Sequence, residues 1–482
     1  MQRIEIRLFF QRFSLATCVV ASFIFLTASN AFCATHYIDC LSGLDSNNGT
    51  SQSTPWKHAP GMQGFSGTYS HSAGDHFVFK GGVVCPISYL PLVVPNGGSA
   101  GNVDMWGGLD QTWFTGGAWT RPIFDGGGTG PTLAPMIQLG ANTYVTLDSV
   151  EIRNQGIPQG GFTHAVTGSG DFQTVNNIYL HGLVTIGQCI NGSDSKQGGI
   201  GLDYTQPHTT LSNSTIDWTD VSPPIGGNSS AAIVFGNTFV GVTNVLVNGW
   251  VTFHDNLVHH MQYSCDTTSH GNALEVLSDT HTTIVYNNIF HDNQSGIVLL
   301  CGNLQFFNNV LYNQVGGLQI DTNCGHEATD SAFVYNNTID GGAAGNGGAG
   351  RVIARGPTLG SLTLQNNHYI LDGSGGNPIC YNQSGCAPVA AITDDHEVRM
   401  TNATATAEGY VVGNSYAPAS STGLTVGVGA NLTNLCGTIG VSLCSDKQGV
   451  ARPASGGWDA GAYLYSGQVS TLPPTNLSAI AH

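Results

Sequence analysis

A near-repeat constrains this chain more than any other feature of its sequence. The stretch Ile284–Ile320 runs twice through apolar residues to an Asn-Asn pair, then through polar residues and a glycine to a short apolar segment. A unit that recurs along the chain and cannot bury its apolar face alone predicts a solenoid of stacked units. We align related polar turns at Asp148, His181, Asn213, Asp255, Asn287, Asn308, Asn336 and Asn366.

The spacing of these turns indicates which solenoid to expect. It varies from 21 residues (Asn287 to Asn308) to 42 residues (Asn213 to Asp255). Leucine-rich and propeller repeats are nearly constant in length, whereas a parallel β-helix accepts insertions in the turns between its short strands. No segment shows a sustained helical period. The sequence therefore predicts an all-β parallel β-helix.

The paired asparagines fit this prediction. Neighbouring coils lie about 4.8 Å apart, so that side chains at equivalent positions line up along the axis. An amide both donates and accepts hydrogen bonds, so a column of asparagines satisfies every member except those at its ends. We expect an asparagine ladder with a structural role and covered ends, because an open coil exposes unpaired strand groups.

The first residues of the chain predict export. Arg3, Arg7 and Arg12 precede the apolar run LATCVVASFIFLTA, as in a signal peptide. Removing Cys18 and Cys33 from the twelve cysteines leaves an even number, which in an oxidising compartment favours disulfides. Short local bridges are expected for Cys380–Cys386 and Cys436–Cys444. The predicted organisation is a signal peptide (1–33), an N-terminal cap with the first coils (34–135), further coils (136–400) and a closing segment (401–482), within one domain.

Composition excludes some partners. Only 9% of the residues are charged, the formal net charge is -17, and no lysine or arginine lies between Lys196 and Arg351. A nucleic-acid partner requires a basic track that displaces counterions, so none is expected. No segment after the signal peptide is apolar enough to cross a bilayer, which predicts an exported protein without a membrane span.

Three segments carry a resemblance to a known family. HYIDCLSGLDSNNGTSQSTPWKHAPGM, AGDHFVFKGG and DKQGVARPASGGWDAGAYLY resemble the entry, first-coil and closing motifs of right-handed parallel β-helix proteins of the pectate-lyase-like superfamily, of the secreted bacterial type. The resemblance covers most of the chain and implies the right-handed form of the fold. The superfamily includes lyases, hydrolases, epimerases and binding proteins, so it does not select an activity.

The resemblance also implies where a cleft lies, along the strand that follows the third turn. Aligning these strands makes Leu274, Ile297, Leu318 and Val352 inward positions and Glu275, Val298, Gln319 and Ile353 outward ones, with Leu300, Asp321 and Arg355 in the next outward row. Long loops with polar residues flank the row, as binding surfaces on repeat scaffolds do. The leading candidate residues are Asp266, His270, Glu275, Gln319, Asp321, His326, Glu327 and Arg355.

The chemistry of this row leaves alternatives open. Asp266, Glu275 and Asp321 provide the oxygen ligands that calcium prefers, with His270 or Arg355 as the base of a polysaccharide lyase. The family usually places a lysine or arginine there, and this region has few. Glu275 and Asp321 are about 12 Å apart by strand geometry, which disfavours hydrolysis. The competing interpretation is a non-catalytic surface or adhesive protein that binds an extracellular polysaccharide.

A second outward column is predicted on the strands that directly follow the polar turns. It contains Asp217, His259, His291, Tyr312 and Asp340 on consecutive coils. Two stacked imidazoles beside a carboxylate can bind a divalent metal or share protons, and the imidazole and phenol rings can contact a substrate. A polar surface without function would contain similar residues.

Overall fold

The computed structural model describes residues 33–467, apart from 129–134, 158–164, 183, 186–199, 203–207, 218–232, 236–249, 261–272, 277–281, 294–297, 302, 314–316, 322–328, 342–351, 357, 372–377, 383, 385 and 440. Residues 1–32 of the predicted signal peptide therefore lie outside the described residues. The chain from Cys33 to His482 clusters as one compact unit. Among the described residues, no helix combines the length and apolar character that a membrane span requires.

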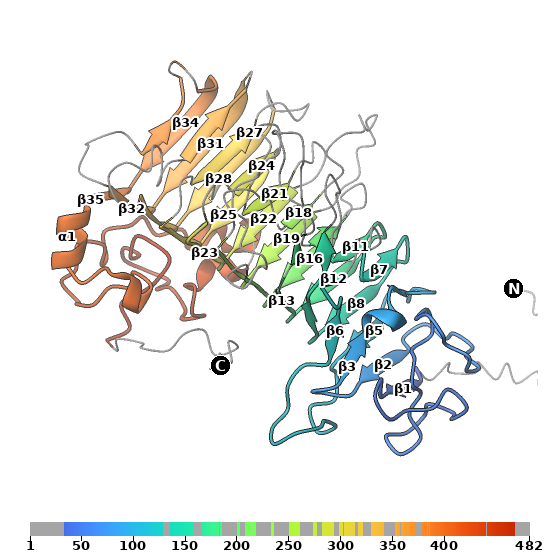
Figure 1. Cartoon of the computed structure of the whole chain (residues 1–482). Coiled ribbons are helices and arrows are strands. Elements are labelled where there is room, and N and C mark those ends of the chain that lie inside the picture. The colour runs from blue at the N-terminus through green and yellow to red at the C-terminus, as the bar shows by residue number, and fades with distance from the viewer. Residues whose placement is uncertain are drawn as a thin grey trace, which may run out of the picture. The chain divides into compact units, whose positions relative to one another are not determined.

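Three long parallel sheets run along this unit, as Figure 1 shows. The twelve-stranded sheet comprises β1 (Thr35–Ile38), β2 (His76–Phe79), β5 (Asp104–Gly107), β8 (Val145–Asp148), β12 (Gln173–Asn176), β16 (Thr209–Ser212), β19 (Trp250–His254), β22 (Thr282–Tyr286), β25 (Leu304–Phe307), β28 (Ser331–Tyr335), β31 (Leu359–Gln365) and β34 (Val389–Asp395). The eleven-stranded sheet comprises β3 (Val84–Pro86), β6 (Ile123–Asp125), β9 (Glu151–Arg153), β13 (Tyr179–His181), β17 (Thr215–Asp217), β20 (Leu257–His259), β23 (Ile289–His291), β26 (Val310–Tyr312), β29 (Thr338–Asp340), β32 (His368–Leu371) and β35 (Val398–Thr401).

The ten-stranded sheet comprises β4 (Leu92–Val93), β7 (Ile137–Gly140), β11 (Val166–Gly168), β15 (Ile200–Leu202), β18 (Ile233–Phe235), β21 (Leu274–Val276), β24 (Val298–Cys301), β27 (Leu318–Asp321), β30 (Val352–Arg355) and β33 (Ile379–Cys380). A two-stranded sheet pairs β10 (Gly156–Ile157) with β14 (Val184–Thr185). The helices are short: η1 (Ile87–Tyr89), α1 (Asn402–Ala407), η2 (Val412–Asn414), η3 (Thr433–Leu435), α2 (Cys436–Ile439) and η4 (Val441–Cys444). One strand from each long sheet makes a coil, and the predicted right-handed parallel β-helix is confirmed.

The core lies inside the coils, where equivalent apolar side chains stack. Val285 pairs in register with Phe306, and Phe306 pairs with Val334, all of them fully buried. In the eleven-stranded sheet, Phe290 and Leu311 form a similar buried pair. Burying apolar area contributes about 25 cal/mol per Å², so these columns are the main source of stability.

The predicted register of β24 was wrong. In β24 the residue in register with Leu274 and Leu318 is Val298, not Ile297, and Val298 and Leu300 are fully buried. The insertion before this strand shifted the alignment by one residue, which exchanges the two faces of a strand. The apolar outward positions predicted there are thus part of the core.

The first two polar turns were also misaligned. The residues equivalent to Asn213 in these two turns are Ser149 and Asn177. All three residues have a positive φ: 51° for Asn213, 56° for Ser149 and 51° for Asn177. His181 lies on the following strand, β13. The sequence VNNIYL contains an Asn-Asn pair that the alignment passed over, and in this pair the second residue, Asn177, has the positive φ.

In the later coils, from Asn287 onwards, the two asparagines of a pair have different roles. The second points into the coil and forms the ladder: the backbone N–H of Asn288 donates to Asn309 Oδ1 at 3.0 Å, and that of Asn309 donates to Asn337 Oδ1 at 2.9 Å. Asn337 Nδ2 donates to Asn367 Oδ1 at 2.9 Å. The ladder ends at Glu397, whose carboxylate accepts from the backbone N–H of Asn367 at 3.0 Å.

In these later coils, the first asparagine of a pair has a positive φ and contacts the closing segment. Asn308 Nδ2 donates to the Ser445 carbonyl at 2.8 Å, and Asn336 Nδ2 donates to the Asp459 carbonyl at 3.1 Å. Helix α1 packs on β32 and β35 at the last coils. The closing segment therefore packs on the eleven-stranded sheet at the last coils and runs back along its turns. The expected cover of this end is partial, because β34 of the twelve-stranded sheet is exposed from Ala390 to Asp395.

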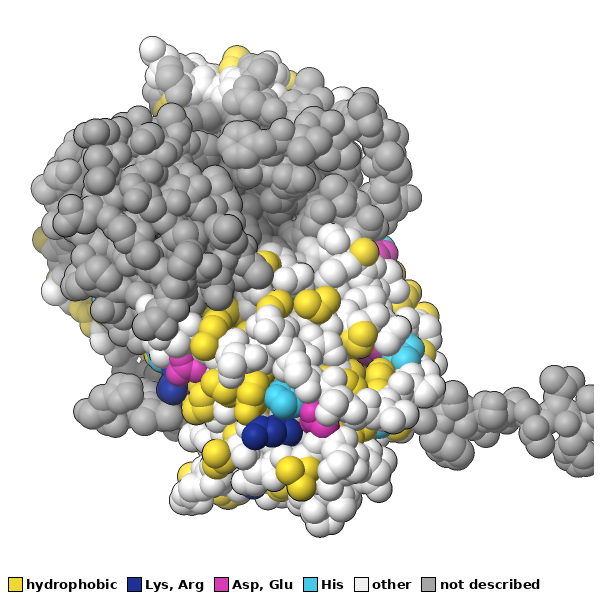
Figure 2. Space-filling view, turned by 45° about the vertical axis from the view of Figure 1, so that its right-hand side comes forward, with side chains coloured by type: hydrophobic (Ala, Val, Ile, Leu, Met, Phe, Trp, Pro, Cys, Tyr) yellow, Lys and Arg dark blue, Asp and Glu magenta, His cyan; other side chains and the backbone are white. Residues whose placement is uncertain are grey.

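Disulfides support both ends of the unit. The predicted local bridges Cys380–Cys386 and Cys436–Cys444 are present, and Cys40 is bonded to Cys85. The described surface in Figure 2 is mostly uncharged, with scattered apolar side chains and few lysines or arginines. This sparse charge agrees with the composition of the chain.

Candidate functional site

The predicted polar row lies on the ten-stranded sheet. Glu275 of β21 is in register with Leu299 of β24, which is in register with Gln319 of β27. Asp321 of β27 is in register with Arg355 of β30. These pairings place Glu275 two coils and two residues from Asp321, and put Asp321 and Arg355 on adjacent rungs.

The described side chains of this row are few. Gln319 is partly exposed, between the buried residues Leu318 and Ile320. The side chains of Glu275, Asp321 and Arg355 lie outside what the structure describes. Asp266, His270, His326 and Glu327 are outside the described residues altogether. Their proposed roles stay predictions.

The second predicted column is described in full. His259, His291 and Tyr312 end β20, β23 and β26, and each is in register with the next. The rings of His259 and His291 stack with centroids 4.9 Å apart, and those of His291 and Tyr312 stack at 4.8 Å. These distances repeat the spacing between coils, because each ring stands on its own rung.

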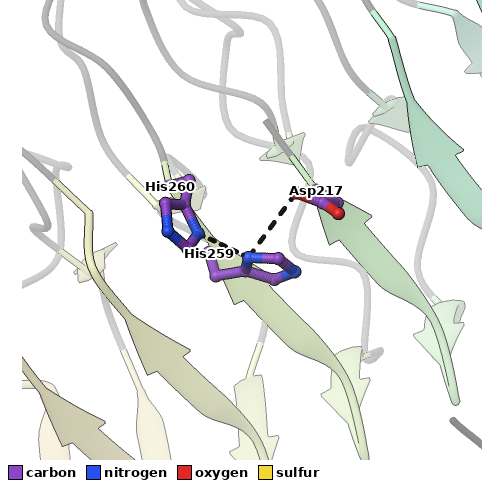
Figure 3. A group of neighbouring side chains, drawn as sticks. All are labelled: Asp217, His259 and His260. Carbon is purple, nitrogen blue, oxygen red and sulfur yellow. Dashed lines mark hydrogen bonds and ion pairs between the residues drawn. The ribbon is translucent and has the colours of Figure 1, made fainter. Parts of the chain in front are cut away.

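Asp217 and His260 complete a group around His259, which Figure 3 shows. His259 Nδ1 lies 2.7 Å from His260 Nδ1 and 3.6 Å from Asp217 Oδ1. The other carboxylate oxygen of Asp217 accepts from the Tyr179 hydroxyl at 3.4 Å. The three ligand atoms of Asp217, His259 and His260 all lie within 4.8 Å of one another.

A second group shares His260 with the first. It joins His260 to His291 and Asp292, again with ligand atoms within 4.8 Å of one another. His291 Nδ1 lies 2.6 Å from Asp292 Oδ2, and Asn313 Nδ2 donates to Asp292 Oδ1. Asp292 is therefore held by both neighbours.

His260 and Asp292 were not predicted from the sequence. Successive side chains of a strand point to opposite faces, so His260 was not expected beside His259. Its φ of 62° ends the strand and brings its ring to the same side. Asp292 and Asn313 have positive φ at the equivalent place, with values of 52° and 48°. The signal was a polar residue directly after β20, β23 and β26, the three strands that end in an aromatic ring of the column.

Burial controls the titration of this cluster. It lowers the pKa of His259 to about 4, against the opposing effect of Asp217, and it also lowers the pKa of His291. Burial alone would raise the pKa of Asp292, but hydrogen bonds from His291 and Asn313 outweigh it and keep this pKa below its usual value. Burial and the Asp292 charge raise the pKa of Tyr312 to about 12.

The closing segment bounds the column on one side. The ring of Tyr416 lies 5.5 Å from that of Tyr312, and its hydroxyl donates to Asp340 Oδ2 at 2.5 Å. The imidazole cluster lies on the side away from Tyr416. Neutral imidazoles with adjacent carboxylates can bind a cation or transfer protons.

No protein-family model matches the sequence, and no curated protein matches it either. Several solved structures are similar to the fold. A GH136 lacto-N-biosidase from Eubacterium ramulus has a TM-score of 0.41 and 11% identity, over 76% of this chain and 68% of that one. Pectate lyase Pel9A has a TM-score of 0.41 and 13% identity, over 90% of this chain and 98% of that one.

A rhamnogalacturonan lyase matches with a TM-score of 0.37 and 14% identity, over 76% of this chain and 87% of that one. Such values do not bear on activity. The predicted resemblance to pectate-lyase-like proteins concerns the fold alone, and the parallel β-helix rests on the strand pairing of the chain itself.

Proposed function

We propose that this chain is an exported protein that binds an extracellular polysaccharide along the outward face of the ten-stranded sheet and cleaves it as a calcium-assisted lyase. The observation that carries the proposal is the register of this sheet, which aligns Glu275, Gln319 and the Asp321–Arg355 pair within four consecutive rungs. A linear polymer presents the same groups at regular intervals, and a regular parallel sheet offers contacts at regular intervals.

The residue types favour an acidic sugar polymer. Carboxylates such as Glu275 and Asp321, with Asp266 from the preceding loop, provide hard oxygen ligands for calcium. A calcium ion held there would neutralise a sugar carboxylate. The ion would take the place of lysine and arginine side chains, of which this protein has few. Arg355 is the cation on the adjacent rung.

The lyase reaction is a β-elimination. A base, His270 or Arg355 in its deprotonated form, takes the proton on the carbon next to the carboxylate. The electrons of that C–H bond form a C=C bond, and the glycosidic C–O bond breaks. The protonated base or a water molecule gives a proton to the leaving oxygen, so atoms and charge balance without a redox partner. Arginine is almost always protonated, which favours His270 as the base.

Hydrolysis is less well supported. It requires two carboxyl groups separated by about 5 to 9.5 Å across the bond. Two coils and two residues separate Glu275 from Asp321, about 12 Å by strand geometry. A non-catalytic polysaccharide-binding protein is the alternative that the scarcity of basic residues favours.

A product assay separates these functions. The mature protein is incubated with polygalacturonate, rhamnogalacturonan and alginate, with and without a chelator, and ultraviolet absorbance of the new C=C bond conjugated with the carboxylate is recorded. We expect absorbance on one polymer, its loss with chelator and recovery with calcium. Glu275→Gln, Asp321→Asn and His270→Ala should each remove most of the activity.

Asp395→Asn is the matched control, because Asp395 is an exposed acid on the twelve-stranded sheet. It should leave the rate unchanged. Retained binding without product on any polymer, in protein and variants alike, would contradict the lyase and support the binding protein. Product that persists after chelation and after all three substitutions would contradict the proposed site.

A further inference from the structure

The imidazole cluster on the eleven-stranded sheet is separate from the proposed calcium row. It contains Asp217, His259 and His260 at the ends of β17 and β20. We propose that these three residues bind one divalent first-row transition ion, of the zinc type. The inference rests on the contacts of these residues and of the neighbouring group His260, His291 and Asp292, on their burial and on the chemistry of their ligand atoms.

The distances fit such an ion. Zinc bonds to imidazole nitrogen and carboxylate oxygen are about 2.0–2.2 Å long, so two ligand atoms on one ion lie roughly 3 Å apart. His259 Nδ1 lies 2.7 Å from His260 Nδ1 and 3.6 Å from Asp217 Oδ1. The atoms already converge, as Figure 3 shows, and small rotations of the rings would equalise the distances.

The donor set selects the ion. Two imidazole nitrogens and one carboxylate suit zinc, nickel or copper, whereas calcium prefers oxygen ligands only. Three protein ligands also leave a fourth position for water or a ligand, as in zinc sites that keep an open position. The two close Nδ1 atoms can otherwise share a single proton, which is the arrangement that an ion would replace.

Neighbouring side chains orient the ligands. The Tyr179 hydroxyl contacts the second oxygen of Asp217, and His291 stacks on the ring of His259. Such contacts fix the rotamers of metal ligands and strengthen binding. The side chains of Asp217 and His259 are 16% and 13% exposed, so the group is partly shielded from water.

The second group, His260, His291 and Asp292, shares His260 with the proposed site. His260 Nδ1, the atom that lies beside His259 Nδ1, has one lone pair and so can serve an ion in only one of the two groups. The 2.6 Å contact between His291 Nδ1 and Asp292 already pairs these two residues. We therefore assign the ion to Asp217, His259 and His260, with His291 and Asp292 as neighbours.

Metal titration tests the assignment. The mature protein is freed of metal with a chelator, desalted and titrated with zinc by calorimetry and with cobalt by visible absorption. We expect one ion per chain and a cobalt spectrum with nitrogen and oxygen ligands. His260→Ala and Asp217→Asn should weaken zinc binding at least about tenfold, since even the loss of a ligand's partner costs about 10- to 100-fold.

His254→Ala is the matched control. His254 lies on the same coil, stacks on Tyr286 and has its Nδ1 2.7 Å from Asp255, but it belongs to neither group. The His254→Ala variant should bind zinc as the unsubstituted protein does. Glu275→Gln should also leave zinc binding unchanged, which would show that this site is separate from the calcium row. Circular dichroism confirms that each variant is folded.

Several outcomes would overturn the proposal. The absence of saturable zinc and cobalt binding by the folded, unsubstituted protein is decisive without any variant. Equal weakening by His254→Ala and His260→Ala would mean adventitious binding by surface histidines. Loss of binding in Asp292→Asn with retention in Asp217→Asn would contradict the assigned ligands.

Discussion

Early and late coils of the solenoid build the same turn with different chemistry. The inward residue of the turn is Val150 or Ile178 in the early coils, and both are fully buried. In the later coils it is an asparagine of the ladder, such as Asn309 or Asn337, which is equally buried. The preceding residue has a positive φ in both regions. The backbone turn therefore does not need the ladder, and the ladder adds hydrogen bonds between coils.

The outward residue of the turn is covered in both regions, by different segments. Arg121 donates to Asn177 Oδ1 in an early coil, and Arg452 donates to Asn308 Oδ1 at 2.9 Å in a later one. Arg452 belongs to the closing segment and also donates to the carbonyls of Asp459 and Gly461. The later coils thus depend on a distant part of the chain.

A leucine placed at the inward position of a late turn and of an early turn should give the largest difference in unfolding free energy. Asn337→Leu removes the acceptor of the Asn309 backbone N–H and side-chain amide, and leaves buried donors unpaired at about 1–3 kcal/mol each. We expect a loss of about 3 to 6 kcal/mol of unfolding free energy. Ile178→Leu should cost less than about 1.5 kcal/mol. Urea unfolding measures both, and equal costs would show that the ladder contributes nothing.

The two arginines allow a smaller contrast. Arg452→Met removes the Arg452 hydrogen bonds to Asn308 Oδ1 and the Gly461 carbonyl, and one of the two donors to the Asp459 carbonyl, in the interior; it should cost about 2 to 4 kcal/mol. Arg121→Met exposes its partner to water, and should cost about 1 kcal/mol. Hydrogen exchange should show loss of protection in the later coils only for Arg452→Met. Uniform loss along the solenoid would contradict the separation of the two regions.

The acidic end of the ladder predicts a pH dependence that the early coils lack. Burial raises the pKa of Glu397 from 4.5 to about 8, against hydrogen bonds from Asn367 that lower it. The folded state then holds a proton that the unfolded state releases, so stability falls as pH rises from about 4.5 to about 8, by at most about 1.4 kcal/mol per pH unit. Glu397→Gln should flatten that slope in urea unfolding across the window. An unchanged slope would mean that another group causes it.

The sequence predicted the fold because the polar turns recur in register with apolar strands. It predicted the column of His259, His291 and Tyr312 for the same reason, since equivalent positions stack. It could not predict His260, because a left-handed residue changes the direction of its side chain. The sequence misplaced Ile297 and Val298, because an insertion before their strand shifts the alignment by one residue. It did not predict the contacts of the closing segment, because these join residues far apart in the chain.

A crystal structure of the mature protein with a polyuronate oligosaccharide and calcium tests the functional account most directly. We expect the sugar to lie across β21, β24, β27 and β30, in contact with Gln319, with the metal on the carboxylates of Glu275 and Asp321. An oligosaccharide bound on another sheet, with this face bare, would contradict the account.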